Sequence, residues 1–88
     1  MTFRFSGALL RYVDYNRTAV IDAVDLGTAL ALLEERHPQL RPVLRDATGE
    51  LRRTHQVFLN GERIPRPSPH LPLRDSDEVV LLTAIAAG

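Results

Sequence analysis

The sequence contains no cysteine and no lysine. Without cysteine the chain can form neither a disulfide nor a thiolate metal site, and it has no thiol nucleophile. Without lysine it offers no side-chain amine for Schiff-base catalysis or for isopeptide formation. The stability of the fold must therefore come from packing.

The sequence also lacks an excess of charge and a long apolar run. Eleven arginines balance 11 acidic residues, so the net charge is zero and no long-range field favours nucleic acid or a membrane surface. The longest uncharged run, residues 79–88, is about half of the roughly 20 residues that a membrane-spanning helix needs. No secretory signal pattern opens the chain. We expect a cytoplasmic protein that binds no nucleic acid and no membrane.

What is present fits one small globular domain. The chain has 88 residues, of which 44% are hydrophobic and 25% charged, as in ordinary globular proteins. Alternation of apolar and polar residues at the start predicts a strand over Thr2–Val13, and β-branched residues predict a second strand over Thr18–Asp22. After the polar turn 14–16, the second strand would pair with the first as a hairpin.

The clearest helix covers Leu26–Arg36. Asp25 is a suitable N-cap, and Pro38 disfavours helical dihedrals at His37. The predicted apolar face consists of Leu26, Ala29, Leu30, Leu33 and His37. Pro38 could also begin a short second helix that runs towards Leu44, although Pro42 is expected to interrupt it.

The second half of the chain predicts strands joined by turns. A strand over Arg53–Leu59 follows the loop 46–50, and Asn60-Gly61 is the strongest hairpin signal in the sequence. Prolines make residues 65–72 a crossing loop, which ends at the polar turn 75–77. The last strand, Glu78–Thr83, is apolar on both faces, as expected for the middle of a sheet.

The predicted order is therefore β-β-α-β-β-β. This order favours an α+β fold of the β-grasp (ubiquitin-like) type: a mixed sheet of four or five strands with one main helix packed on one face. We expect residues 1–83 to form this domain and residues 84–88, which are mostly small, to form a flexible C-terminal tail.

Several segments resemble the MoaD/ThiS family of ubiquitin-like sulfur carriers. They are Phe58-Leu59-Asn60-Gly61-Glu62, the stretch from Leu73 through Asp75 to Leu82, and the C-terminal glycine. Together with the helix, the resemblance covers nearly the whole chain. The resemblance implies that the working group is the C-terminal carboxylate of Gly88 and that the protein is a carrier, not an enzyme.

In that family a partner adenylating enzyme of the MoeB/ThiF type uses ATP to activate this carboxylate, which is then converted to a thiocarboxylate. The carrier itself binds no cofactor. The resemblance implies that Gly88 donates sulfur to a biosynthetic enzyme of a molybdopterin, thiamine, cysteine or natural-product pathway. The family motif ends Gly-Gly, whereas here Ala86 and Ala87 precede Gly88. A β-grasp interaction module whose tail is never activated therefore stays open as the alternative.

Two alternating apolar sets occupy the third and last strands. Phe58, Val80 and Leu82 alternate with Val57, Leu59, Val79 and Leu81. One set should face the helix, and the other should face outward as a surface on which partner enzymes dock. We expect the docking set to be Phe58, Val80 and Leu82, although the sequence does not decide between the two faces.

The remaining candidates have simpler explanations. His37, His55 and His70 are far apart and have no carboxylate at ligand spacing, so we expect no metal and attribute them to surface or helix-end packing. The acidic turn 75–78 is expected to be a solvated turn that could dock a basic partner surface. Arg52-Arg53 is too small a patch, without interleaved aromatics, to indicate nucleic-acid binding.

Overall fold

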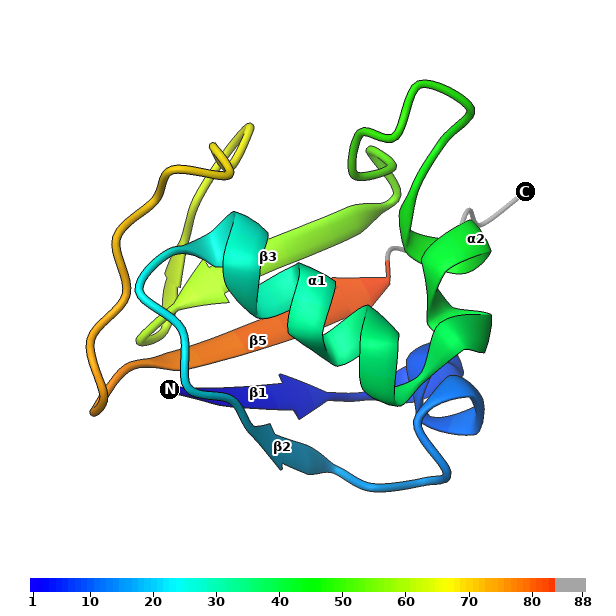
Figure 1. The fold of residues 1–88 in the computed structure, drawn as a ribbon, viewed down its shortest axis with the longest axis horizontal. Helices are drawn as coiled ribbons and strands as arrows, with labels where there is room; N and C mark the ends of the chain where they lie inside the picture. The colour runs from blue at the N-terminus through cyan, green and yellow to red at the C-terminus, as the bar shows by residue number, and fades with distance from the viewer. Residues whose placement is uncertain (84–88) are drawn as a thin grey trace.

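The computed structural model describes residues 1–83. These residues form a five-stranded mixed sheet with the order β2-β1-β5-β3-β4, and helix α1 crosses one face of it (Figure 1). The strands are β1 Thr2–Phe5, β2 Thr18–Val20, β3 His55–Leu59, β4 Glu62–Arg63 and β5 Glu78–Thr83. The helices are η1 Gly7–Tyr12, α1 Leu26–Arg36, η2 Pro38–Leu40 and α2 Arg41–Leu44. β5 runs parallel to β1 and antiparallel to β3, so the predicted central position of the last strand is confirmed.

The first strand is shorter than predicted. It ends at Phe5, and residues 7–12 form the 3₁₀ helix η1 instead of continuing to Val13. Gly7 has a φ of +64°, which leaves the extended region and reverses the chain. The turn into η1 buries Leu9 in the core. The apolar run that suggested a longer strand is therefore a short helix that closes one end of the core.

Helix α1 begins and ends where the sequence predicts. The carboxylate of Asp25 accepts a hydrogen bond from the Thr28 N–H at 2.8 Å, which satisfies one of the free donors of the first turn. The helix ends at Arg36, just before the 3₁₀ turn that Pro38 opens. The short second helix predicted from Pro38 is divided just before Pro42, into η2 over Pro38–Leu40 and α2 over Arg41–Leu44. Pro42 lies in the first turn of α2, where its missing N–H has no intrahelical partner to lose.

The crossing loop packs directly on the start of α1. The N–H groups of Leu26 and Gly27 donate to the carbonyls of Leu71 and Pro69, at 2.9 and 2.8 Å. A Cβ on Gly27 would lie only 2.9 Å from the Cβ of Pro69. The proline-rich loop thus supplies acceptors for two further helix donors, and this contact requires a glycine.

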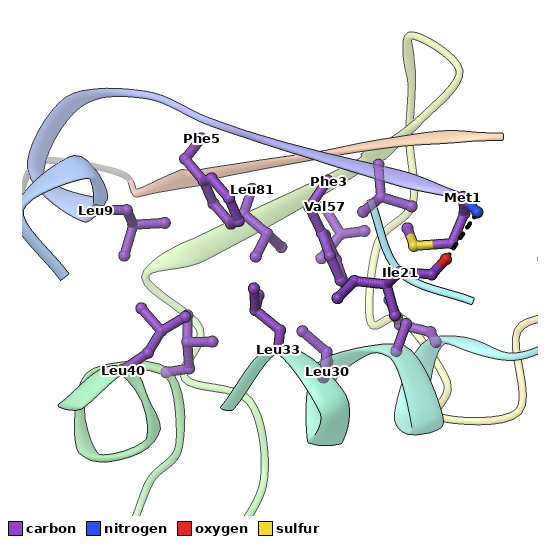
Figure 2. Close-up of a cluster of buried hydrophobic side chains, with 14 of the residues drawn as sticks. Met1, Phe3, Phe5, Leu9, Ile21, Leu30, Leu33, Leu40, Val57 and Leu81 are labelled. Carbon is purple, nitrogen blue, oxygen red and sulfur yellow. Dashed lines mark hydrogen bonds between the residues drawn. The ribbon is translucent and has the colours of Figure 1, made fainter. Parts of the chain in front are cut away.

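The core lies between α1 and the inner face of the sheet (Figure 2). Leu30 and Leu33 of α1 point towards Phe3, Val57 and Leu81 of the sheet, and all of these side chains are buried. Truncating such a leucine to alanine typically costs about 2–5 kcal/mol. At the edge of this core, the nitrogen of Met1 donates to the Ile21 carbonyl at 2.9 Å, the bond dashed in Figure 2.

The Asn60-Gly61 turn forms as predicted. Both residues have positive φ, 50° and 85°, and they join β3 to β4 as an antiparallel hairpin. β3 begins at His55 and not at Arg53, because a turn closed by the His55 N–H and the Arg52 carbonyl occupies the preceding residues.

Candidate functional site

The predicted working group follows the last described residue. β5 ends at Thr83, and Ala86, Ala87 and Gly88 lie outside the described residues. The proposed division into residues 1–83 and 84–88 and the role of Gly88 therefore stay predictions. What the structure does describe is the end of β5 and the surfaces around it.

A buried histidine holds the end of β5. His55 lies opposite Thr83 in the β3–β5 ladder, and its side chain is only 7% exposed. One ring nitrogen, Nε2, lies 2.7 Å from the Val43 carbonyl, which can only accept, so Nε2 carries the proton. The other, Nδ1, lies 3.2 Å from the Thr83 hydroxyl. His55 therefore ties the end of β5 to α2, in which Val43 lies.

This role of His55 was not predicted. The sequence suggested surface or helix-end packing for all three histidines, and His55 instead makes two buried polar contacts within the fold. His37 does lie at the end of α1, with its Nδ1 3.8 Å from the Asp14 carboxylate, and His70 is exposed on the crossing loop. Within residues 1–83, no three His, Asp or Glu side chains gather as metal ligands would.

The structure decides which apolar set faces outward. Val57, Val79 and Leu81 are buried against α1, whereas Leu82 is 36% exposed on the opposite face. Phe58 and Val80 lie directly opposite each other in the β3–β5 ladder and are half-buried.

Together Phe58, Val80 and Leu82 form an apolar strip, here called the outer strip. Helices α1 and α2 lie on the other side of the sheet (Figure 1). Charged side chains border the outer strip: Arg4 lies beside Val80 in the β1–β5 ladder and pairs with Glu78 at 3.2 Å. An apolar centre with a charged border is the usual anatomy of a protein-docking surface, but its use for docking stays a prediction.

The segments that carry the family resemblance meet in space. The Asn60 side chain donates to the Asp77 carboxylate at 2.9 Å and accepts from the Glu78 N–H at 2.9 Å. Asp77 also accepts from the Arg74 N–H at 2.8 Å. The hairpin tip is thereby clipped to the turn that starts β5. The Asn60 hydrogen bond, followed by the Arg74 bond, lowers the pKa of Asp77 below its usual value.

This clip changes the interpretation of the acidic turn. Asp77 was expected to be solvated and available to a partner, but both of its carboxylate oxygens bond within the chain. Asp75 is exposed, so a docking role stays a prediction for that residue. Asn60 and Asp77 are 17 residues apart, and only the hairpin brings them together.

No helix within residues 1–83 has both the length and the apolar character needed to cross a membrane.

Solved structures share this architecture over almost the entire chain. SAMP1 from Haloferax volcanii matches with a TM-score of 0.86 and 24% identity, over 99% of this chain and 97% of that chain. A chain of the BexX/CysO complex from Amycolatopsis orientalis matches with 0.84 and 19%, over 99% and 98%. CysO from Mycobacterium tuberculosis matches with 0.82 and 21%, over 96% and 98%. At these identities the likeness shows the fold, and it confirms the predicted β-grasp architecture.

The family comparison covers most of the sequence. No curated protein sequence matches the chain, but the model of the ThiS family matches residues 9–88. This range includes both segments joined by the Asn60–Asp77 clip. The chain therefore belongs to the ThiS family, among the ubiquitin-like sulfur carriers that its sequence resembles.

Proposed function

We propose that this protein carries sulfur as a thiocarboxylate on Gly88. The Gly88 carboxylate attacks the α-phosphate of ATP in a partner enzyme, and pyrophosphate leaves to give an acyl adenylate. Sulfide then displaces AMP from the acyl carbon, which leaves a thiocarboxylate. Small carriers of this family are not enzymes themselves, so the activating chemistry belongs to the partner and ATP binds there. The thiocarboxylate is a good nucleophile and can pass its sulfur to a biosynthetic enzyme.

The observation that carries the proposal is the family match, which extends through the C-terminal residues. The structure of residues 1–83 is consistent with the carrier proposal. β5 has hydrogen-bonded neighbours on both sides, β1 and β3, and the His55–Thr83 contact fixes its end. A rigid body of this kind would hold the residues that follow Thr83 at a defined place relative to a docked enzyme.

We propose that the outer strip is where the activating enzyme docks. Val80 and Leu82 lie on β5, the strand that precedes the predicted reactive residues, and Phe58 lies on its neighbour β3. Among residues 1–83, no helix lies on their side of the sheet in Figure 1. Burying such side chains contributes roughly 25 cal/mol per Å² of apolar surface. A partner of the MoeB/ThiF type would then bind the body through this strip and receive the last residues of the chain in its active site.

The second candidate is an interaction module that is never activated, and Ala87 favours it. The methyl group of Ala87 stands where the family has a glycine, which a narrow channel accepts more readily. The two candidates share the fold and the outer strip. They differ only in whether Gly88 reacts.

The adenylation step separates the two candidates. We expect the protein to stimulate exchange between ATP and pyrophosphate by a cognate adenylating enzyme of the MoeB/ThiF type. A chain that lacks Gly88 is the control and should abolish the exchange. Ala87→Gly should raise the rate with an activator taken from another family member, because the methyl group is removed. If no adenylating enzyme of the same organism supports the exchange, the interaction module is favoured.

A further inference from the structure

The two edges of the sheet differ in how far they are protected. β4 consists of two charged residues, Glu62 and Arg63, and Pro65 follows soon after. Short length, charge and proline prevent an edge strand from pairing with another chain. β2, the opposite edge strand, is Thr18–Val20, and none of its residues is charged or proline. In Figure 1, β2 lies at the margin of the sheet, with no other strand of residues 1–83 beyond it. Apart from its short length, the β2 edge lacks these protections.

The backbone of β2 presents hydrogen-bonding groups along this edge. On either side of the strand, the Arg17 carbonyl and the Ile21 N–H bond across to residues 1–5, each at 2.9 Å. Hydrogen-bonded and non-hydrogen-bonded residues alternate along an antiparallel ladder. The N–H and C=O groups of Thr18 and Val20 therefore point away from β1. Both residues are exposed, and no loop within residues 1–83 bonds to these groups.

The most exposed large apolar side chains of residues 1–83 lie on β2 and on the segments next to it. Val20 is 69% exposed, Tyr15 in the turn before β2 is 71% exposed, and Val24 after β2 is 74% exposed. The remaining exposed large hydrophobic residue within 1–83 is Leu82, at 36%. Exposed apolar side chains close to an unpaired strand edge favour an interaction with another protein chain.

The charges beside β2 are complementary to those of a second copy. Arg17 precedes the strand and Asp22 follows it. Both are exposed, and neither belongs to an ion pair formed within residues 1–83. Antiparallel pairing of two β2 strands reverses the order of residues, so Arg17 of each copy arrives at the end where the other copy has Asp22. A parallel arrangement would place like charges together.

The α1 side of this edge also has no excess of one charge. Glu35 and Arg36 of α1 are exposed and line a hollow of about 460 Å³ beside Asp22. The whole chain has no net charge, so two copies do not repel each other at long range. An edge that is complementary to itself is what a two-fold dimer requires. A second copy therefore fits this edge better than a strongly acidic or basic partner.

We propose that a second copy of this chain binds at the β2 edge. The two β2 strands pair antiparallel about a two-fold axis, and the outward N–H and C=O groups of Thr18 and Val20 complete the ladder. Three-residue strands bury much less than the roughly 800 Å² per partner of a stable complex, so the dimer is weak and reversible. The proposal goes beyond sulfur transfer and uses neither Gly88 nor the outer strip. Its failure would leave the carrier proposal untouched.

The first test follows the full chain over a range of concentrations. In sedimentation velocity, the sedimentation coefficient should rise towards that of a dimer between about 10 µM and 1 mM, the range of a weak interface. Over the same range, hydrogen exchange at the Thr18 and Val20 amides should slow, because these N–H groups become bonded. A chain that stays monomeric throughout would overturn the proposal. Protection of these amides by an added threonine–valine peptide, in a chain that stays monomeric, would do the same.

Two substitutions to lysine distinguish the β2 edge from the outer strip. Val20→Lys brings like charges together in the proposed interface and should weaken the dimer about tenfold or more. The variant should fold, because Val20 is 69% exposed in the monomer. Leu82→Lys is the matched control and should change the dissociation constant of the dimer by less than about twofold. The opposite result would assign the dimer to the outer strip, and equal effects would exclude β2 as the interface.

The charges at the two ends of β2 provide a rescue test. Arg17→Asp and Asp22→Arg should each weaken the dimer about threefold or more at low salt, because each places like charges together. Combined in one chain, the two substitutions restore opposite charges across the interface. The dissociation constant should then return to within about twofold of the wild-type value. A combined variant that does not recover would contradict the antiparallel pairing.

Discussion

Apolar residues on the two faces of β3 and β5 have different surroundings. Val57 and Leu81 are almost completely buried under α1, whereas their neighbours Phe58 and Leu82 lie on the side without a helix. The inner set contributes to the stability of the fold. The outer set is less buried: Phe58 and Val80 are half-buried and Leu82 is 36% exposed. Hydrophobicity alone thus says little about the role of a residue until its face is known.

The largest expected effect comes from truncating one residue on each face. Leu81→Ala should lower the free energy of unfolding by about 2–5 kcal/mol, because it leaves a cavity in the core. Leu82→Ala should change it by about 0.5 kcal/mol or less, because that side chain is partly exposed. Urea unfolding of both variants measures the difference. Equal losses would show that the two faces do not differ in the proposed way.

A smaller effect should appear in activation and not in stability. Leu82→Asp places a charge in the outer strip and should lower kcat/KM for adenylation by about tenfold, which corresponds to roughly 1.4 kcal/mol. Val24→Asp is the matched control, because Val24 is 74% exposed and lies in the loop before α1. If both variants were activated at the same rate, the outer strip would not be the docking surface.

Local signals predicted much of the fold, and long-range contacts explain most of what was missed. Asp25 and Pro38 bracket α1 within the sequence itself, so its bounds were predictable. The strand end at Phe5 depends on the left-handed conformation of Gly7, which residue type permits but does not require. The partners of His55 are 12 and 28 residues away in the sequence, so no local sequence pattern predicts these contacts.

The outer strip also could not be identified from local sequence patterns alone. Both alternating sets on β3 and β5 are apolar, so periodicity could place them on opposite faces but could not choose the outer one. The choice depends on where α1 packs, which is a tertiary property. The resemblance to the MoaD/ThiS family identified the chain because it rests on segments, such as Asn60-Gly61, whose turn chemistry is also local.

The smallest expected effect concerns the hydrogen bond between Asn60 and Asp77. The folded pKa of Asp77 is lowered from its usual 3.8, mainly by the Asn60 hydrogen bond. The carboxylate therefore contributes its full stability above that value and loses it as the pH falls through the lowered folded pKa. Asp77→Asn removes this titration. The free energy of unfolding of the wild type should fall more steeply than that of the variant below about pH 4; parallel curves would argue against the clip.

The most direct measurement for the carrier proposal is the intact mass of the protein after incubation with ATP, its own adenylating enzyme and a sulfide source. We expect one oxygen to be exchanged for one sulfur, and fragmentation should place the change on Gly88. A chain that ends at Ala87 should keep its original mass. An unchanged mass of the full chain, under conditions in which the enzyme activates another carrier, would contradict the account.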